Sequence, residues 1–353
     1  MGDTERFESC LGLLERRIAA LSGEVARALV LPPPPTSSEL ARCPRWITTG
    51  VGASEGAARL MALLLRRHGI LAEFAPVSAF VGEPPAADVC VVVTQALSPN
   101  ARLALACQQA YAHTLLITTQ TARSSALVAA AEASGVVVVT HGPPEEDGLL
   151  LRVVGPACAS AAVVSLSLHL VRASGGPRSA LAWADHLDDV ASAIDGAGER
   201  AASALASRSP RALLDVAGFV AAGEDAALFD GFRHKVLEGL GRSQPPLWDM
   251  CGIAHGPLQS FYDRRATVIS LERSGSPTNG ELVARLERVL DPGRHTLIRL
   301  GSALPGPLAL FDLDAQLDHL LVAALRAAPR DLANWPGKGR DEPLYGLGTD
   351  ALQ

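Results

Sequence analysis

Short runs of β-branched residues alternate with apolar helical segments along most of this 353-residue chain. The clearest run lies in DVCVVVTQ at 88–95, where five apolar residues follow one another without a polar residue between them. Because successive side chains of a strand point to opposite faces, such a strand must be buried on both faces. Strands of this kind that alternate with helices are typical of a parallel sheet covered by helices. The sequence therefore predicts an α/β fold.

The alternation occurs twice and predicts two doubly wound parallel-sheet domains in tandem. We expect the first domain over residues 45–173 and the second over residues 211–328, with a helical linker over 174–210 between them. A helix and a proline-rich linker are predicted for residues 1–44. Residues 329–353 show no periodicity and are predicted to form a C-terminal tail that closes the site.

Composition and charge exclude several classes of protein. The net charge is −6, and no basic tract or Cys/His finger spacing is present, which argues against nucleic-acid binding. The polar start MGDTERFESC differs from a secretory signal, and we identify no run of about 18 uncharged apolar residues for a membrane span. Six cysteines without Cys-x-x-Cys spacing favour free thiols in a reducing cytoplasm. No metal-ligand spacing is found among the histidines, so we expect no metal site.

The turn after the first predicted strand reads TGVGASEG over residues 49–56. It does not match the dinucleotide fingerprint G-x-G-x-x-G, because Glu55 stands where the third glycine is needed. It does match the nucleophile elbow G-x-S-x-G of serine hydrolases, with Ser54 as the nucleophile. It also fits an anion cradle, in which Ser54 and the helix N-terminal amides hold a phosphate or carboxylate. The remaining alternative is an ordinary strand-to-helix turn with a serine cap.

Polar residues also follow the Val-rich strand, where a helix is predicted to begin at Ser98. Ligands of open α/β sheets bind outside the carboxyl ends of the strands, where the strand order reverses. We therefore predict a substrate-binding group at this edge that includes Ser54, Thr94, Gln95, Ser98 and Asn100.

Three segments in this order resemble the SIS (sugar isomerase) domain family, which binds phosphosugars. They are GVGASEGAA at 50–58, VVVTQALSPNARL at 91–103, and ITT with SSAL at 117–127. The best-matching subgroup has two such domains, as in the isomerase half of glucosamine-6-phosphate synthase. The resemblance covers about residues 45–353.

The second predicted domain extends the resemblance. The spacing from Gly223 to Lys235 and Glu238 matches a family segment in which a glycine opens a helix that carries Lys and Glu three residues apart. HGPL from His255 resembles the family segment K-H-G-P-L, and DEP at 341–343 resembles the D-x-P of the tail. Residues three apart share one helical face, so we expect Lys235 and Glu238 to pair; the alternative is an ordinary exposed pair.

The resemblance implies isomerisation, or deamination or deglycation, of a phosphosugar or another acidic sugar derivative. Glu238 would move a proton between C1 and C2 of the open-chain sugar, His255 would open the ring, and Lys235 would be their electrostatic partner. No cofactor is implied. The expected protein is a cytoplasmic homodimer whose partner molecule is a small sugar derivative.

Several residues depart from the family pattern. The phosphate loop S-Q-S-G-E-T reads TQALSP at 94–99, so two hydroxyl groups are lost and Leu97 replaces a glycine. Arg152 stands in a segment where the family has small and hydroxylated residues, as either a new anion contact or a solvated residue. In the tail, Gly348 replaces the ring-opening lysine, and Lys338 could compensate only if the tail ran differently. These departures favour an alternative, a non-catalytic sugar-phosphate sensor or regulatory subunit. A second His-Gly-Pro at 141–143 is interpreted as chance.

Overall fold

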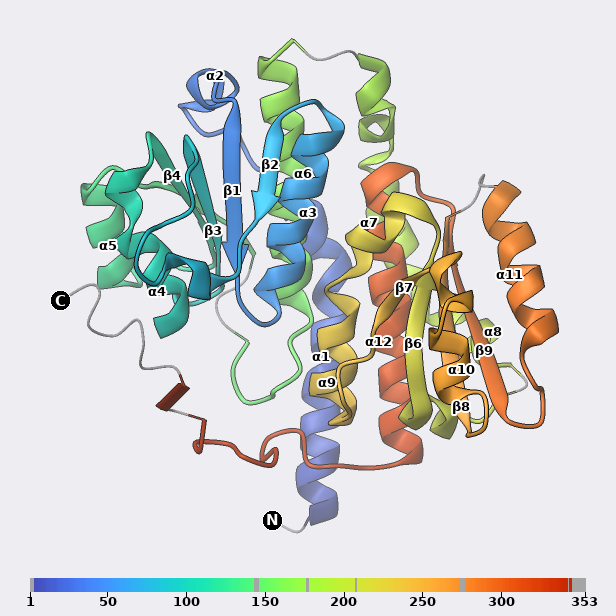
Figure 1. Ribbon diagram of the computed structural model, residues 1–353. Coiled ribbons are helices and arrows are strands. Elements are labelled where there is room, and N and C mark those ends of the chain that lie inside the picture. The colour runs from blue at the N-terminus through green and yellow to red at the C-terminus, as the bar shows by residue number, and fades with distance from the viewer. Residues whose placement is uncertain are drawn as a thin grey trace. The chain divides into compact units, whose positions relative to one another are not determined.

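The computed structural model describes residues 3–142, 146–175, 178–206, 208–273, 277–341 and 343–344 (Figure 1). Its contacts divide the chain into two compact units, each with one parallel sheet. The five-strand unit comprises residues 23–147, 154–185 and 334–353, and the four-strand unit comprises residues 1–22, 148–153 and 186–333. The predicted α/β class with two parallel sheets is confirmed.

The sheet of the five-strand unit has the order β2-β1-β3-β4-β5, and every neighbouring pair is parallel. Its strands are β1 (Arg45–Gly50), β2 (Leu71–Phe74), β3 (Val89–Val93), β4 (His113–Thr118) and β5 (Val137–Thr140). All five residues of β3 are buried, as its unbroken apolar pattern predicts. The chain moves from β1 outward to β2 and then returns to β3 on the other side, so the strand order reverses between β1 and β3.

Helices cover both faces of this sheet (Figure 1). Cys90 and Val92 pack in one apolar cluster with residues of α4 and α5. On the opposite face, the Thr48 hydroxyl donates to the Ala58 carbonyl of α3, and α3 packs against α6. The helices are α2 (Ser37–Leu40), α3 (Ser54–Arg67), α4 (Pro99–Ala106), α5 (Ala126–Ala133) and α6 (Val154–Ala173), with 3₁₀ helices η1 (Val77–Phe80) and η2 (Gln108–Ala110).

Helix α6 corrects the expectation that the chain has no uncharged apolar run long enough for a membrane span. It is long and apolar enough to cross a membrane by length and composition, but 83% of its 18-residue window is buried inside the protein. The helix therefore serves as a core helix of the five-strand unit. It begins at Val154. Residues 148–153, directly before the helix, belong to the four-strand unit. A local sequence pattern does not reveal this assignment.

The sheet of the four-strand unit has the order β7-β6-β8-β9, again all parallel. Its strands are β6 (Val216–Ala221), β7 (Leu247–Asp249), β8 (Ala266–Arg273) and β9 (His295–Ser302). Its helices are α7 (Asp189–Asp195), α8 (Ala197–Leu205), α9 (Phe232–Leu240), α10 (Pro257–Phe261), α11 (Pro277–Val289) and α12 (Ala309–Ala327). The 3₁₀ helices of this unit are η4 (Pro210–Asp215), η5 (Gly223–Phe229), η6 (Gly252–Ala254) and η7 (Gly306–Leu308), whereas η3 (Arg178–His186) belongs to the five-strand unit except for its last residue. The N-terminal helix α1 (Asp3–Leu29) has residues in both units.

Gly50, at the end of β1, allows helix α3 to begin close to the sheet. A Cβ atom at this position would lie 2.7 Å from the Ser54 carbonyl oxygen and 3.1 Å from the Val93 carbonyl oxygen. Both atoms belong to the backbone and cannot rotate away. We expect Gly50→Ala to displace the first turn of α3 and to lower the free energy of unfolding by about 1–3 kcal/mol in urea denaturation. Gly301→Ala is the matched control, because no atom lies within 4 Å of a Cβ there. Equal stability of the two variants would contradict this close approach.

Candidate functional site

Two helices begin side by side at the carboxyl edge of the five-strand sheet. Strands β1 and β3 are neighbours, α3 follows β1, and α4 follows β3. Because the strand order reverses between these two strands, their carboxyl ends form a topological switch point. The N-terminus of a helix carries unpaired N–H groups and a partial positive charge, which favour anions and hydrogen-bond acceptors. This edge can therefore hold an anionic or oxygen-rich ligand.

Ser54 lies at the start of α3, one residue later than the capping position predicted for it. The N-cap is Ala53, which has helical backbone angles, and its side chain makes no cap. Ser54 is 7% exposed, and its N–H donates to the Val51 carbonyl at 3.3 Å. A nucleophile elbow needs a strained turn at the serine, whereas the only non-glycine residue with positive φ among those the structure describes is Leu97. The backbone at Ser54 thus gives no support to the hydrolase alternative.

Hydrogen bonds from the backbone of the loop between β3 and α4 fix this loop to the end of β4. Thr94 is buried, and its N–H donates to the Ile117 carbonyl at 3.0 Å. The carbonyl of Gln95 accepts from the hydroxyls of Thr118 and Thr119 at 2.7 and 3.0 Å. Leu97 has φ +51°, so this loop keeps a left-handed conformation that a glycine adopts without strain. The Leu97 side chain is 1% exposed and packs in the apolar cluster under α4, which offsets that strain.

The start of α4 matches its prediction. Ser98 is the N-cap, and its hydroxyl oxygen accepts from the Ala101 N–H at 3.4 Å, with Pro99 as the first helical residue. Asn100, in the first turn, donates its side-chain amide to the carbonyl of Leu344 at 3.3 Å. The described end of the tail therefore reaches this edge of the five-strand unit. Gly348 lies outside the described residues, and the Lys338 ammonium lies 4.6 Å from the Trp335 ring centroid.

Four of the buried polar atoms without partners belong to residues at or beside this edge. Within the described part of the chain, the side-chain nitrogen of Gln95, the side-chain oxygen of Asn100 and both ring nitrogens of His141 have no hydrogen-bond partner. His141 directly follows β5 and is 2% exposed, and burial lowers its pKa to about 4. Polar groups in this state are rare in folded proteins, because each costs free energy. The sequence pattern around His141 predicted no role for this residue.

Lys235 does not serve as the side-chain partner of Glu238 that the i, i+3 spacing predicts. Its ammonium lies 2.8 Å from a carboxylate oxygen of Asp314 and 2.8 Å from both carboxylate oxygens of Asp318. All three side chains are buried, with Lys235 4% exposed. Burial alone would lower the Lys235 pKa, but the two carboxylates outweigh it and hold the pKa above its ordinary value. This ion triad joins α9 to α12 inside the four-strand unit.

Glu238 lies one turn further along α9 and is half-buried. Its carboxylate accepts from the backbone N–H of Arg152 at 3.4 Å, within the four-strand unit. A half-buried carboxylate on a helix fixed by the ion triad can act as a proton acceptor. Arg152 contacts Glu238 through its backbone, a role that its side-chain type does not indicate.

His255 lies on an exposed turn after β7, also in the four-strand unit. The Asp249 carboxylate accepts from the N–H groups of Cys251 and Gly252 at 2.9 and 3.2 Å, which fixes the start of this turn. Gly256 follows with φ +116°, a value that requires glycine, and its N–H donates to the Gln259 side chain at 3.1 Å. The turn thus presents His255 to solvent on a defined backbone.

The structure divides the predicted site residues between the units. The carboxyl edge of the five-strand unit carries Ser54, Thr94, Gln95, Ser98 and Asn100, and the four-strand unit carries Arg152, Lys235, Glu238 and His255. The partners of Lys235 were not predicted from the sequence. Asp314 and Asp318 are four residues apart on one face of α12, in a chain with only two lysines. Buried acids with that spacing indicate a cationic partner.

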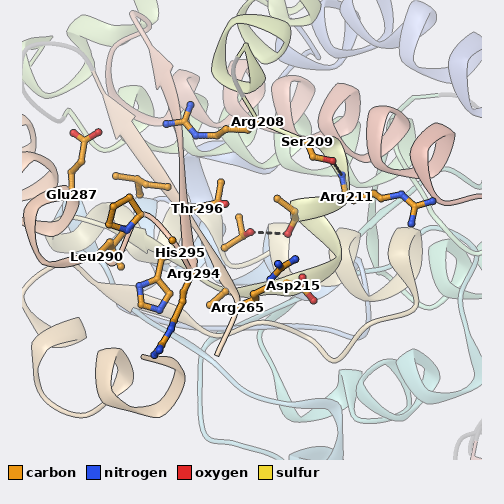
Figure 2. A pocket seen from close by; sticks show the side chains of 16 residues that line it. Arg208, Ser209, Arg211, Asp215, Arg265, Glu287, Leu290, Arg294, His295 and Thr296 are labelled. Carbon is orange, nitrogen blue, oxygen red and sulfur yellow. Dashed lines mark hydrogen bonds between the residues drawn. The ribbon is translucent and has the colours of Figure 1, made fainter. Parts of the chain in front are cut away.

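A hollow of about 640 Å³ lies at the opposite edge of the four-strand sheet, at the amino ends of β8 and β9 (Figure 2). Charged residues line it: Arg208, Arg211, Asp215, Arg265, Glu287 and Arg294. The guanidinium groups of Arg208, Arg211 and Arg294 point in different directions and do not converge on a common point (Figure 2). The hollow contains none of the predicted site residues.

Several solved structures similar to this chain are of proteins named for sugar phosphates. The C-terminal domain of glucosamine-fructose-6-phosphate aminotransferase from Francisella tularensis has a TM-score of 0.67 at 12% identity, over 88% of this chain and 96% of that chain. Glucosamine-6-phosphate deaminase from Thermotoga maritima has a TM-score of 0.65 at 13% identity, over 91% and 96%.

A third solved structure, tagatose-6-phosphate ketose/aldose isomerase from Escherichia coli, has a TM-score of 0.63 at 17% identity, over 92% of this chain and 95% of that chain. No protein-family model and no curated protein sequence matches this chain. At such identities the likeness concerns the fold. The chain therefore has the tandem sugar-isomerase (SIS) fold, with two parallel α/β sheets, that these three proteins share.

Proposed function

We propose that this protein binds a phosphorylated or otherwise acidic sugar derivative and isomerises or deaminates it. The observation that carries this proposal is the pair of helix N-termini at the switch point between β1 and β3, where Ser54, Thr94 and Ser98 lie. Such an edge suits an anionic, hydroxyl-rich ligand. The fold shared with two sugar-phosphate isomerases or deaminases agrees with this ligand class.

In this proposal Glu238 is the catalytic base. It removes the proton from C2 of an open-chain aldose, the C2–H electron pair forms a C1–C2 double bond, and the carbonyl oxygen takes a proton to give an enediol. Return of a proton to C1 and loss of the C2 hydroxyl proton complete the ketose. His255 would handle the ring oxygen when the hemiacetal opens. Lys235 acts through structure, because its ion triad fixes the helix that carries Glu238.

The second candidate is a sugar-derivative sensor without turnover. Two observations favour it: Leu97 directs its side chain into the apolar cluster beside the loop, and Pro99 offers no N–H at the first position of α4. The start of α4 therefore presents fewer donors than a helix start usually does. A sensor would share the ligand of the enzyme and lack its chemistry. In either case the expected protein is a cytoplasmic homodimer that needs no organic cofactor.

A thermal-shift screen tests the ligand class. A ligand that binds the native state raises the melting temperature, so we expect hexose phosphates and amino-sugar phosphates to raise it and inorganic phosphate at the same concentration to raise it less. Ser54→Ala should reduce the shift, and Ser134→Ala, an exposed serine at the end of α5, should leave it unchanged. A melting temperature that no sugar derivative changes would refute the proposal.

A further inference from the structure

His141 is a buried polar residue that the fold leaves unsatisfied. Both of its ring nitrogens are buried and have no partner among the described residues, and only its backbone is engaged, through an N–H that donates to the Thr118 carbonyl at 2.9 Å. A structural histidine in a core normally pairs at least one ring nitrogen. The unpaired state costs free energy that some other interaction must offset.

His141 and Gln95 lie on the same face of the five-strand sheet, each just after the end of a strand. In β5, Val138 packs in the apolar cluster under α4 and α5, so by strand alternation His141 belongs to the opposite face. Gln95 lies on that face too, because its side-chain amide lies against Gly155 of α6. Strands β3 and β5 are separated by β4, which places the two strand ends about 10 Å apart. An open-chain sugar spans a similar length.

The start of α6 lies against Gln95 and against Gly142, the residue after His141. A Cβ atom at Gly155 would be 2.0 Å from the Gln95 side-chain nitrogen, so only a glycine leaves room for that amide. One turn later, Cys158 lies against the backbone of Gly142, where a Cβ atom would be 2.8 Å from the Cys158 Cβ. The start of α6 thus lies beside the ends of β3 and β5, where Gln95 and His141 lie.

The charges at this point favour a neutral group. The Glu146 carboxylate accepts from the Gly155 N–H at 2.8 Å, so the N-terminus of α6 already has an anion. His141 is neutral, because burial lowers its pKa to about 4. A neutral imidazole offers one donor and one acceptor, and the Gln95 amide nitrogen offers donors. A hydroxyl group, which both donates and accepts, complements this set, whereas a phosphate accepts only.

We propose that His141 is a specificity-determining residue that hydrogen-bonds a hydroxyl group of the ligand, with the Gln95 amide donating to a second ligand oxygen. The α6 side of the sheet edge would then recognise the uncharged, hydroxylated carbon chain of a sugar. This inference rests on the proposed function. It gives a role to the His-Gly pair at 141–142. From the sequence alone, this pair is interpreted as chance.

Calorimetric titration with D-glucitol 6-phosphate and with inorganic phosphate tests this role. We expect His141→Leu to weaken glucitol 6-phosphate binding about 10-fold, the value of one hydrogen bond, and to leave phosphate binding unchanged. His141→Gln, which keeps a donor and an acceptor, should recover part of the affinity. His113→Leu is the matched control, because His113 begins β4 at the amino edge of the same sheet. His141→Leu should also melt at or above the wild-type temperature, because it removes an unsatisfied polar group.

The outcomes separate this inference from the proposed function. A wild-type protein that binds neither probe, and whose melting temperature no sugar derivative changes, refutes the proposed function and this inference with it. Equal binding of glucitol 6-phosphate by wild type and His141→Leu overturns the role of His141 and leaves the proposed function standing. A melting temperature of His141→Leu well below that of His113→Leu shows a structural histidine and likewise overturns the inference.

Discussion

Replacement of Lys235 by alanine is expected to destabilise the four-strand unit by about 3–5 kcal/mol, because it leaves Asp314 and Asp318 buried without their cation. The midpoint of urea unfolding, followed by circular dichroism, measures this loss. The Lys235 pKa is raised, so the contribution of the ammonium is complete below the ordinary lysine pKa of about 10.4 and is lost only as the pH rises through the higher folded value. In the variant, Asp314 and Asp318 lie buried without a cation, and burial raises the pKa of the Asp314 carboxyl, so the destabilisation should grow as the pH rises from about 5 to 9.

The chain contains a matched control for this variant. Lys338, its only other lysine, is exposed beside Trp335, and Lys338→Ala should cost less than about 1 kcal/mol. The combined variant Lys235→Met, Asp314→Asn, Asp318→Asn should recover much of the stability, because no unpaired charge remains. Wild-type stability of Lys235→Ala together with a complete loss of turnover would show a catalytic lysine and contradict the structural role.

Replacement of Glu238 by glutamine is expected to lower kcat by about 10²–10⁴-fold, because an amide cannot accept the C2 proton and a general base contributes a factor of that size. The change keeps the size of the side chain and one oxygen that can accept from the Arg152 N–H, so the fold should persist. Steady-state turnover and calorimetric binding on the same preparation separate the two effects. We expect kcat to fall while the dissociation constant stays within a few-fold of wild type.

Glu132→Gln serves as the control for this experiment. Glu132 is exposed on α5 in the five-strand unit, and its replacement should leave kcat and binding unchanged. A Glu238→Gln protein with wild-type kcat would remove Glu238 from the reaction. A Glu238→Gln protein that loses binding and turnover together would give Glu238 a binding role and contradict its assignment as the base.

Much of the fold follows from the sequence, because the features that specify it are local. The unbroken apolar run of β3 requires burial on both faces, and all five residues are buried. Ser98 followed by Pro99 predicts a helix start, and Ser98 caps α4. The helix boundary at Ser54 is predicted to within one residue. The helix begins at Ser54, but the N-cap is Ala53 and not the serine.

The site could be predicted less well, because its contacts join residues distant in sequence. Lys235 and Glu238 share a helix face, which suggests a pair, but Asp318, 83 residues away, holds the lysine in the folded protein. His141 looks like a chance motif in the sequence, and only the fold shows that its ring is buried without a partner. Leu97 keeps a left-handed backbone because of its buried side chain, a compensation that a substitution pattern does not reveal.

The most direct test of the proposed chemistry is proton exchange at C2 of the sugar derivative that gives the largest thermal shift. Wild-type protein is incubated with that compound in D₂O, and the C2 proton signal is followed by NMR. Transfer of a proton between C1 and C2 through a carboxylate base predicts that deuterium enters C2 with time, in proportion to protein concentration. A ligand that binds and keeps its C2 proton would contradict an isomerase and would assign the protein to the sensor class.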